Sequence, residues 1–274
     1  MKRVLRTWPG LIVVLLLTVF VLGPLLTTLP ADQYFSDTQT WEYFRVLKLT
    51  MRYELPGVFA DNPFPRAVNG SLWSLPFEFH WYLILRGLGV VRLVRVRPLL
   101  ALCAVAFAAY VFEIKDVQHK PGVSVGLEYG TFFCYGLCLY YFRDLWAIRK
   151  RVILAVAGIA AMALYASGRE YAALFLILPP AVIFFGSASS PFIRHAGRFG
   201  DFSYGIYIYA FPVQQTLVCL CGNHWSYGMQ LAASTLITFA LAFLSWHLIE
   251  GPALRLKLRV DQPAQEAMPL KAVV

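Results

Sequence analysis

The stretch NGSLWSLPFEFHWYLILRG, residues 69–87, places an acid inside what otherwise reads as the start of a membrane-spanning helix. Ser74 can cap a helix whose first turn contains Pro76, a position that tolerates proline because the first N–H groups of a helix have no partner in the helix. Glu78 then falls within about one turn of that start. An ionised carboxylate that faced lipid would cost about 3 kcal/mol, so the position of Glu78 needs an explanation.

Two explanations fit this acid. A carboxylate in the first turn complements the positive end of the helix dipole and reaches headgroup water, which requires no function. Alternatively, Glu78, Tyr82 and Arg86 are four residues apart and share a helix face that descends about 12 Å. A polar stripe of that depth is expected to face a bundle interior or a wet cavity rather than lipid. The residues alone leave both explanations open.

Composition places the whole chain in a membrane. Of its 274 residues, 59% are hydrophobic and 14% are charged, whereas about a quarter of the residues of an ordinary soluble domain are charged. Apolar stretches of about 17 to 25 residues, long enough to cross a bilayer, recur along the sequence, which predicts an all-α polytopic membrane protein with about eight transmembrane helices. The predicted spans are residues 9–29, 75–91, 97–114, 126–142, 151–167, 171–187, 203–221 and 229–249.

One membrane domain accounts for residues 1–259, and residues 260–274 are expected to form a flexible cytoplasmic tail. The first 30 residues begin with basic residues, continue with apolar residues and end with small residues, and a signal peptide has the same order. Their apolar part, about twenty residues, is longer than the usual apolar region of such a peptide. We therefore expect a retained span.

The net charge of +9 predicts the orientation. When the loops are assigned alternately to the two sides, sixteen of the 24 Lys and Arg residues fall on the side of the termini, seven fall on the other side, and Arg86 lies inside a span. Positive residues near span ends remain in the cytoplasm, so both termini are predicted to be cytoplasmic. The same distribution argues against nucleic-acid binding.

A second stretch, GRFGDFSYGIYIYAFPVQQTLV at residues 197–218, repeats the pattern from the cytoplasmic side. Pro212 removes a backbone hydrogen bond in mid-helix and leaves a carbonyl near Ile208 to find another partner. Gln214 and Gln215 follow at depth. A kinked helix with paired glutamines indicates a pathway or a binding site.

The start of this second helix carries polar side chains as well. Ser203 or Asp201 can cap it, and Tyr204 and Tyr207, three residues apart, share a face. Aromatic stripes at helical spacing are usually packing. We nevertheless expect substrate-binding residues on the two stretches, namely Tyr82, Arg86, Ser203, Tyr204, Tyr207 and Gln214.

The sequence predicts no metal site and no serine-hydrolase site, because HExxH, GxSxG and Gly-rich phosphate loops are lacking. The five cysteines also lack the CxxC spacing of zinc or redox sites and are interpreted as small apolar helix residues. They are Cys103, Cys134, Cys138, Cys219 and Cys221.

Four ordered motifs resemble one family, acyltransferase family 3, the bacterial membrane O-acyltransferases that modify cell-surface glycans. NGSLWSLPFEFHWYL resembles its Asn-Gly-x-Leu-Trp-Ser/Thr-Leu pattern followed by a Glu and an aromatic residue. FGDFSYGIYIYAFPV resembles its Gly-x-x-Ser-Tyr-x-x-Tyr-x-x-x-x-Pro pattern. HLIEGPALRLKLR resembles its Glu-x-Pro ending of the last span, here Glu250 and Pro252. MKRVLRTWPGLIVV resembles the basic stretch, with Arg3, Arg6 and Pro9, that leads into its third span.

The resemblance implies that an acyl group, commonly acetyl, passes from cytoplasmic acyl-CoA to a hydroxyl of a surface or exported glycan at the inner (plasma) membrane. It implies no bound cofactor, with acyl-CoA as co-substrate. Arg3 and Arg6 would lie near the CoA phosphates, and Glu78 and Trp73 would be the catalytic residues. Partners would be membrane lipid and the acceptor glycan. Apart from the resemblance, Glu113 and Glu128 fall near outer span ends, which predicts an acidic, sugar-accepting vestibule in the outer half.

The sequence also departs from the family pattern. Two further spans would precede the first span here, with an Arg and a His that acts as base, and many members have a His where Ala210 stands. The expectation is therefore an N-terminally truncated domain. An alternative is an inactive truncated member that acts as a binding partner, with another chain supplying the missing spans. A transporter or flippase is a further alternative, since it would equally explain an acid and a kinked helix at depth.

Overall fold

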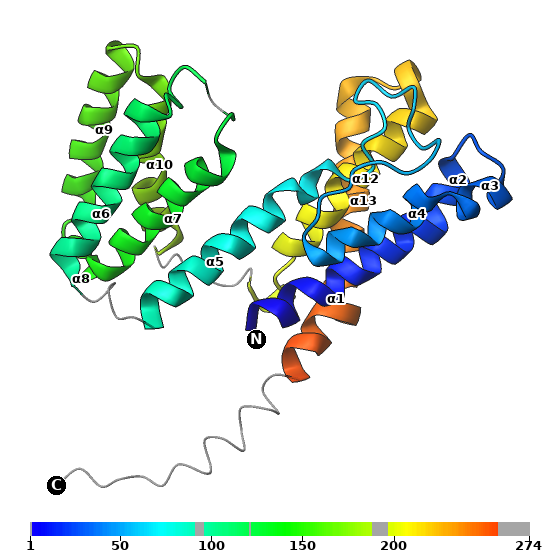
Figure 1. Cartoon of the computed structure of the whole chain (residues 1–274), viewed down its shortest axis with the longest axis horizontal. Helices are drawn as coiled ribbons and strands as arrows, with labels where there is room; N and C mark the ends of the chain where they lie inside the picture. The colour runs from blue at the N-terminus through cyan, green and yellow to red at the C-terminus, as the bar shows by residue number, and fades with distance from the viewer. Residues whose placement is uncertain (1, 91–95, 121, 188–196, 257–274) are drawn as a thin grey trace, which may run out of the picture. The chain divides into compact units, whose positions relative to one another are not determined.

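The computed structural model describes residues 2–90, 96–120, 122–187 and 197–256 (Figure 1). Among these residues the secondary structure is helical, apart from an isolated β-bridge between Thr27 and Val58. The chain divides into two compact units. The first unit comprises Met1–Pro76 and Phe192–Val274, and the second unit comprises Phe77–Pro191.

Each of the eight predicted spans is a helix. The first begins earlier than predicted: α1 (Lys2–Leu17) continues through Pro9 into the π-helix η1 (Thr18–Leu22) and α2 (Gly23–Leu26). The next six agree with prediction to within one residue at either end, and the last begins two residues early and continues to Leu256, seven residues beyond the predicted end. They are α5 (Leu75–Val90), α6 with the π-helix η5 (Arg97–Ala109 and Tyr110–Ile114), α7 (Val125–Tyr141), α9 (Lys150–Ala166), α10 (Glu170–Gly186), α12 (Ser203–Cys221), and α13 with the π-helix η8 (Tyr227–Ser245 and Trp246–Glu250).

Within the described part of the chain, three helices are long and apolar enough to cross a membrane, namely Arg3–Leu26, Arg97–Ile114 and Tyr227–Leu256. Large apolar side chains such as Leu102 and Leu236 are exposed on these helices, as expected where a helix faces lipid. The helices that the structure describes are thus those expected of a membrane protein. The predicted tail, 260–274, lies outside the described residues.

Short helices and an irregular stretch connect α2 to α5. The stretch at 49–69 is irregular except for the bridge at Val58, and it precedes the 3-10 helix η3 (Gly70–Ser74). The short elements before it are α3 (Ala31–Ser36), α4 (Thr38–Glu42) and the 3-10 helix η2 (Tyr43–Lys48); those elsewhere are α8 (Arg143–Trp146), η6 (Gly197–Phe199) and η7 (Gly222–His224).

Helix α12 packs against both α13 and α1 in the first unit (Figure 1). Gly205 allows the close approach to α13, because a Cβ atom there would lie 2.8 Å from Ala242 Cα. Gly10 on α1 similarly faces the ring of Tyr204, 3.0 Å from where its Cβ would be. The buried core of this unit joins α1 and α12 to the segment between α2 and α5, with members such as Leu11 and Ile208.

The π-helix η1 leaves a carbonyl group that a distant side chain satisfies. The Gly23 N–H bonds to Thr18 O, and the next nitrogen in that register belongs to Pro24, which has no hydrogen. Val19 O therefore lacks a partner within the helix. The hydroxyl of the fully buried Tyr34 donates to it at 3.0 Å, which fixes α3 against the end of the first span.

The second unit is held largely by aromatic side chains. Trp81 on α5 donates through Nε1 to Gly126 O at 2.7 Å, and its ring covers Gly130, where a Cβ would come within 1.9 Å. Phe175 on α10 gathers further rings, with centroids 5.2 to 5.4 Å away, from Phe112, Phe132 and Tyr135.

Candidate active site

An ion pair joins α1 to the start of α12. Arg6 donates to one carboxylate oxygen of Asp201, and the other oxygen accepts from the hydroxyl and the N–H of Ser203, at 2.5 and 3.3 Å. Asp201 rather than Ser203 is therefore the acceptor at this helix start. Burial raises the pKa of the Asp201 carboxyl, but the hydrogen bond from Ser203 and the charge of Arg6 outweigh burial, so the pKa lies below its usual value.

The predicted tyrosines hold neighbouring segments through their hydroxyls. Tyr204 donates to Thr7 O at 2.9 Å, which ties α12 to α1. Tyr207 donates to Ser71 O and lies 3.1 Å from Ser74 Oγ, which ties α12 to η3. Ser74, expected as a helix cap, thus shares a hydrogen bond with Tyr207.

The partner predicted for the carbonyl near Pro212 is Asn69. Its side-chain amide donates to Ile208 O at 2.9 Å, four residues before the proline that cannot donate. Asn69 is 1% exposed, so this amide bond replaces the missing helix bond inside the protein. The prediction of an external partner is confirmed, and its identity required the structure.

Gln215, not Gln214, is the glutamine that engages the rest of the first unit. Its amide nitrogen donates to Phe64 O and Ala67 O, both at 2.7 Å. Asn62 donates to the side-chain oxygen of Gln215 at 3.1 Å. Gln214 is exposed. Its substrate-binding role stays a prediction.

Trp73 lines a pocket of about 530 Å³ in the first unit, hereafter the aromatic pocket. The lining residues are Tyr53, Glu54, Phe64, Pro65, Ala67, Gly70, Trp73 and Phe211. Trp73 is 39% exposed, and Phe64 packs edge-on against Phe211 with ring centroids 5.8 Å apart.

Three other predicted site residues lie on α5 in the second unit. Glu78 is in the first turn and is half-buried. Tyr82, one turn later, packs edge-on against Phe133 with centroids 5.3 Å apart, and Arg86 is exposed. Their four-residue spacing on one helix is confirmed, while their roles stay predictions. Arg3, nearly one turn before Arg6 along α1, is exposed.

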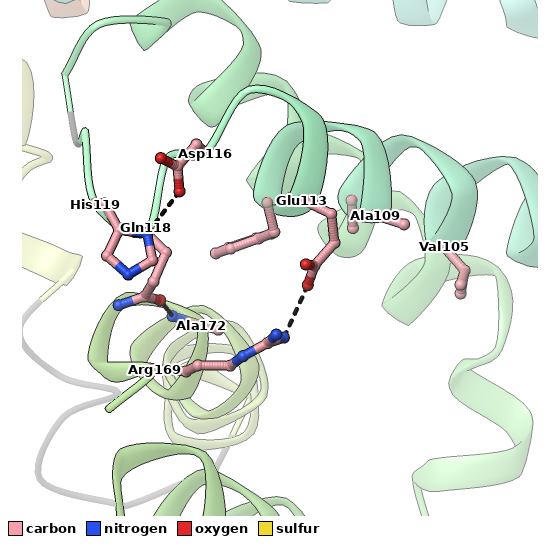
Figure 2. A pocket seen from close by; sticks show the side chains of 10 residues that line it. Val105, Ala109, Glu113, Asp116, Gln118, His119, Arg169 and Ala172 are labelled. Carbon is pink, nitrogen blue, oxygen red and sulfur yellow. Dashed lines mark hydrogen bonds and ion pairs between the residues drawn. The ribbon is translucent and has the colours of Figure 1, made fainter. Parts of the chain in front are cut away.

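A second pocket, of about 350 Å³, lies in the second unit (Figure 2). Figure 2 shows its charged groups turned toward one another: Arg169 donates to Glu113 at 2.8 Å, and His119 lies 2.6 Å from Asp116. The hydrogen bond with His119 holds the pKa of Asp116 below its usual value. The polar groups of this pocket are thus engaged with one another.

Glu128 does not present a free carboxylate to a vestibule. It is 8% exposed, and its two oxygens accept from the N–H of Gly122 at 2.8 Å and from the hydroxyl of Tyr171 at 3.1 Å. Together with the pairing of Glu113, this leaves the predicted acidic vestibule without two of the carboxylates expected to line it.

A buried carboxyl group near the end of the last span was not among the predicted site residues. Glu250 is 1% exposed, one of its oxygens accepts from Ser245 at 2.7 Å, and the other has no hydrogen-bond partner among the described residues. The Glu-x-Pro pattern marked this residue, but its burial depends on packing that the motif does not reveal. Among the described residues no three His, Cys, Asp or Glu side chains gather in a way that could hold a metal ion.

The first unit thus places an arginine, a carboxylate and hydroxyl groups between the apolar helices α1 and α12. An acyltransferase domain model matches residues 1–247. The chain therefore belongs to acyltransferase family 3, as its four motifs predicted.

Two curated proteins are similar along most of the chain. An O-acetyl transferase of Shigella phage Sf6 is 29% identical over 257 residues, which cover 91% of this chain and 74% of that protein. Nodulation protein 10 of Rhizobium leguminosarum bv. viciae is 29% identical over 287 residues, which cover 93% of this chain and 75% of that protein. No solved structure matches the chain.

Proposed function

We propose that the chain is a multi-pass inner-membrane O-acyltransferase that moves an acyl group, commonly acetyl, from cytoplasmic acyl-CoA to a hydroxyl of a surface or exported glycan. The observation that carries this proposal is the family match over residues 1–247, together with the similarity to a protein named O-acetyl transferase. The sixteen-to-seven split of basic residues supports eight spans with both termini in the cytoplasm.

On the donor side, Arg3 and Arg6 would bind the CoA phosphates. A guanidinium matches phosphate as a charged donor with several N–H groups. Arg6 is already oriented by Asp201, so a phosphate would share Arg6 with that carboxylate or displace it. The half-exposed state of the pair, with side chains 40% and 43% accessible, leaves Arg6 within reach of a ligand.

On the acceptor side, the hydroxyl that attacks the acyl carbonyl must lose its proton, and the developing oxyanion must be stabilised. Glu78 would hydrogen-bond the acceptor hydroxyl or orient the base that takes its proton, and Trp73 would shape the reaction centre. Tyr82, Arg86, Ser203, Tyr204, Tyr207 and Gln214 would contribute to substrate binding.

Glu78→Gln tests the catalytic role of the carboxylate, because it preserves the shape of the side chain and removes its charge. Membranes that contain the chain are incubated with acetyl-labelled acetyl-CoA, and label in the surface glycan is measured. We expect Glu78→Gln to reduce transfer about a hundredfold, the low end for a positioned acid or base.

The matched control is Glu113→Gln, which removes a carboxylate of the same unit at its exposed ion pair and should leave transfer near the wild-type rate. Wild-type rates from Glu78→Gln at normal membrane levels would mean that this carboxylate only complements its helix dipole. No transfer by wild-type membranes above that of membranes lacking the chain would overturn the proposed function.

A further inference from the structure

The irregular segment at 62–69 lies beside the middle of a helix predicted to span the membrane. Asn69 contacts Ile208 O and Gln215 contacts Ala67 O, and these two α12 positions are about 10 Å apart along the helix axis. The segment therefore follows α12 for about two turns within its length, rather than only at its end.

Irregular backbone at membrane depth is tolerated only where it is buried in protein or lines a water-filled cavity. One side of this segment meets the first condition, because Val68 and Asn69 are buried and Gln215 binds its carbonyls. Its other side, at Phe64 and Pro65, borders the aromatic pocket. Because this side is not buried in protein, the backbone is expected to line a water-filled cavity at the aromatic pocket rather than to face lipid.

Three aromatic side chains of this pocket present exposed surface. Phe64 is 62% exposed, Trp73 39% and Tyr53 37%. The pocket wall behind these side chains is closely packed. The ring of Phe211 lies so near Gly70 that a Cβ atom on residue 70 would be 2.8 Å from the ring. Any larger residue at position 70 would push this ring away, so the pocket shape depends on that glycine.

A carboxylate completes the lining. Glu54 is exposed and makes no hydrogen bond or ion pair with the other described residues. Flat apolar rings bury the C–H faces of a ligand, and a charged acceptor strengthens hydrogen bonds from its hydroxyl groups. A hydrocarbon tail would use the rings and leave the carboxylate desolvated, which is costly. A pyranose ring can pack its C–H face on the aromatic rings and donate hydroxyl hydrogen bonds to the carboxylate.

We propose that the aromatic pocket binds a sugar ring of the acceptor glycan, with Phe64 and Trp73 against its C–H faces and Glu54 accepting from its hydroxyl groups. This inference rests on the proposed function for the identity of the acceptor. It adds Tyr53, Glu54 and Phe64 as specificity residues in a segment that the family motifs do not cover.

The test uses a matched pair at one position. Phe64→Tyr keeps a flat ring, whereas Phe64→Leu keeps apolar bulk and loses the flat face. The purified full chain is incubated with methyl pyranosides of glucose, galactose, rhamnose and N-acetylglucosamine, and saturation transfer from protein to sugar protons is measured by NMR. We expect transfer to the C–H face of at least one pyranoside, preserved in Phe64→Tyr and weakened about tenfold in Phe64→Leu.

Glu54→Gln tests the carboxylate and should also weaken binding about tenfold, whereas Asp61→Asn, in the same irregular stretch at 49–69 but outside the aromatic pocket, should not. Absence of transfer to every pyranoside, or equal transfer in the two Phe64 variants, would overturn the inference. Pyranoside binding that Glu54→Gln leaves unchanged would show that the carboxylate does not contact the sugar and would also overturn it.

Kinetics separate this inference from the proposed function. Acyl transfer with an unchanged acceptor KM in Phe64→Leu and Glu54→Gln would refute the pocket and leave the function standing. Sugar binding that depends on Phe64 and Glu54, with no acyl transfer by wild type, would refute the function and support the pocket. A raised acceptor KM at constant kcat in both variants supports both.

Discussion

The two units stabilise their helices by different means. In the first unit, buried amides and hydroxyls of α12 and its neighbours bind backbone carbonyls that no helix satisfies, as Asn69 does for Ile208 O and Gln215 for Ala67 O. In the second unit, helices pack through aromatic rings around Phe175, and ion pairs such as Arg169–Glu113 lie at the exposed rim.

This contrast indicates which residues specify the structure. A buried polar group that loses its partner bears the full cost of desolvation, so each such bond selects one arrangement of the chain. Exposed ion pairs contribute little, because water and salt screen them. Substitutions in the first unit should therefore have the larger effects on stability.

The largest effect is expected from Gln215→Leu. It leaves the carbonyls of Phe64 and Ala67 without their donor, and we expect a loss of about 3 kcal/mol in the free energy of unfolding. Thermal unfolding of the purified protein measures the loss, and faster tryptic cleavage at Arg66 reports release of the segment. Gln214→Leu, one residue away and exposed, is the matched control and should change neither readout. Equal effects of the two variants would contradict the assigned contacts.

A double-mutant cycle tests the replacement bond at the kink. Asn69→Ala should cost about 2 kcal/mol, because Ile208 O becomes a buried acceptor without a donor. In a Pro212→Ala background, residue 212 regains the N–H that this carbonyl would bind within the helix. The Asn69→Ala cost should then fall by about 1 kcal/mol. Strict additivity of the two substitutions in unfolding experiments would show that Asn69 does not compensate for the proline.

Acid should weaken the link between α1 and α12 through Asp201. Because the pKa of Asp201 is lowered in the folded protein, its contribution is complete above the unfolded pKa of about 4 and is lost as the pH falls through the lower folded value. Asp201→Asn removes this pH dependence. Since both side chains of the pair are more than a third accessible, we expect about 1 kcal/mol or less. Melting temperatures between neutral pH and pH 3 that fall in parallel for both proteins would argue against the coupling.

The smallest effect is expected in the second unit. Glu113→Gln breaks the ion pair with Arg169, whose side chains are 59% and 52% accessible. We expect a loss of about 0.5 kcal/mol at low salt and less at high salt, because the pair is screened. The measurement is thermal unfolding at two salt concentrations. A loss as large as that of Gln215→Leu would erase the distinction between the two units.

Sequence patterns predicted the helices well and the site less completely. The spans at 97–114 and 203–221 match the observed helices residue for residue, because apolar length alone sets where a chain can cross a bilayer. The patterns also predicted an external partner for the carbonyl opposite Pro212. They could not choose Gln215 over Gln214, since adjacent residues differ only in the face they present, and the burial of each face depends on distant segments.

The sequence by itself determined that this chain is a helical membrane protein of acyltransferase family 3, through apolar stretches and four local motifs that need no long-range contact to be recognised. Only the tertiary structure decided three further features. Asp201 forms an ion pair with Arg6, the amide of Asn69 donates to Ile208 O, and Phe64 and Trp73 line the same pocket. Residues more than a hundred positions apart make the first two contacts. Their hydrogen bonds depend on how the packed helices bring them together, which no spacing along the chain records.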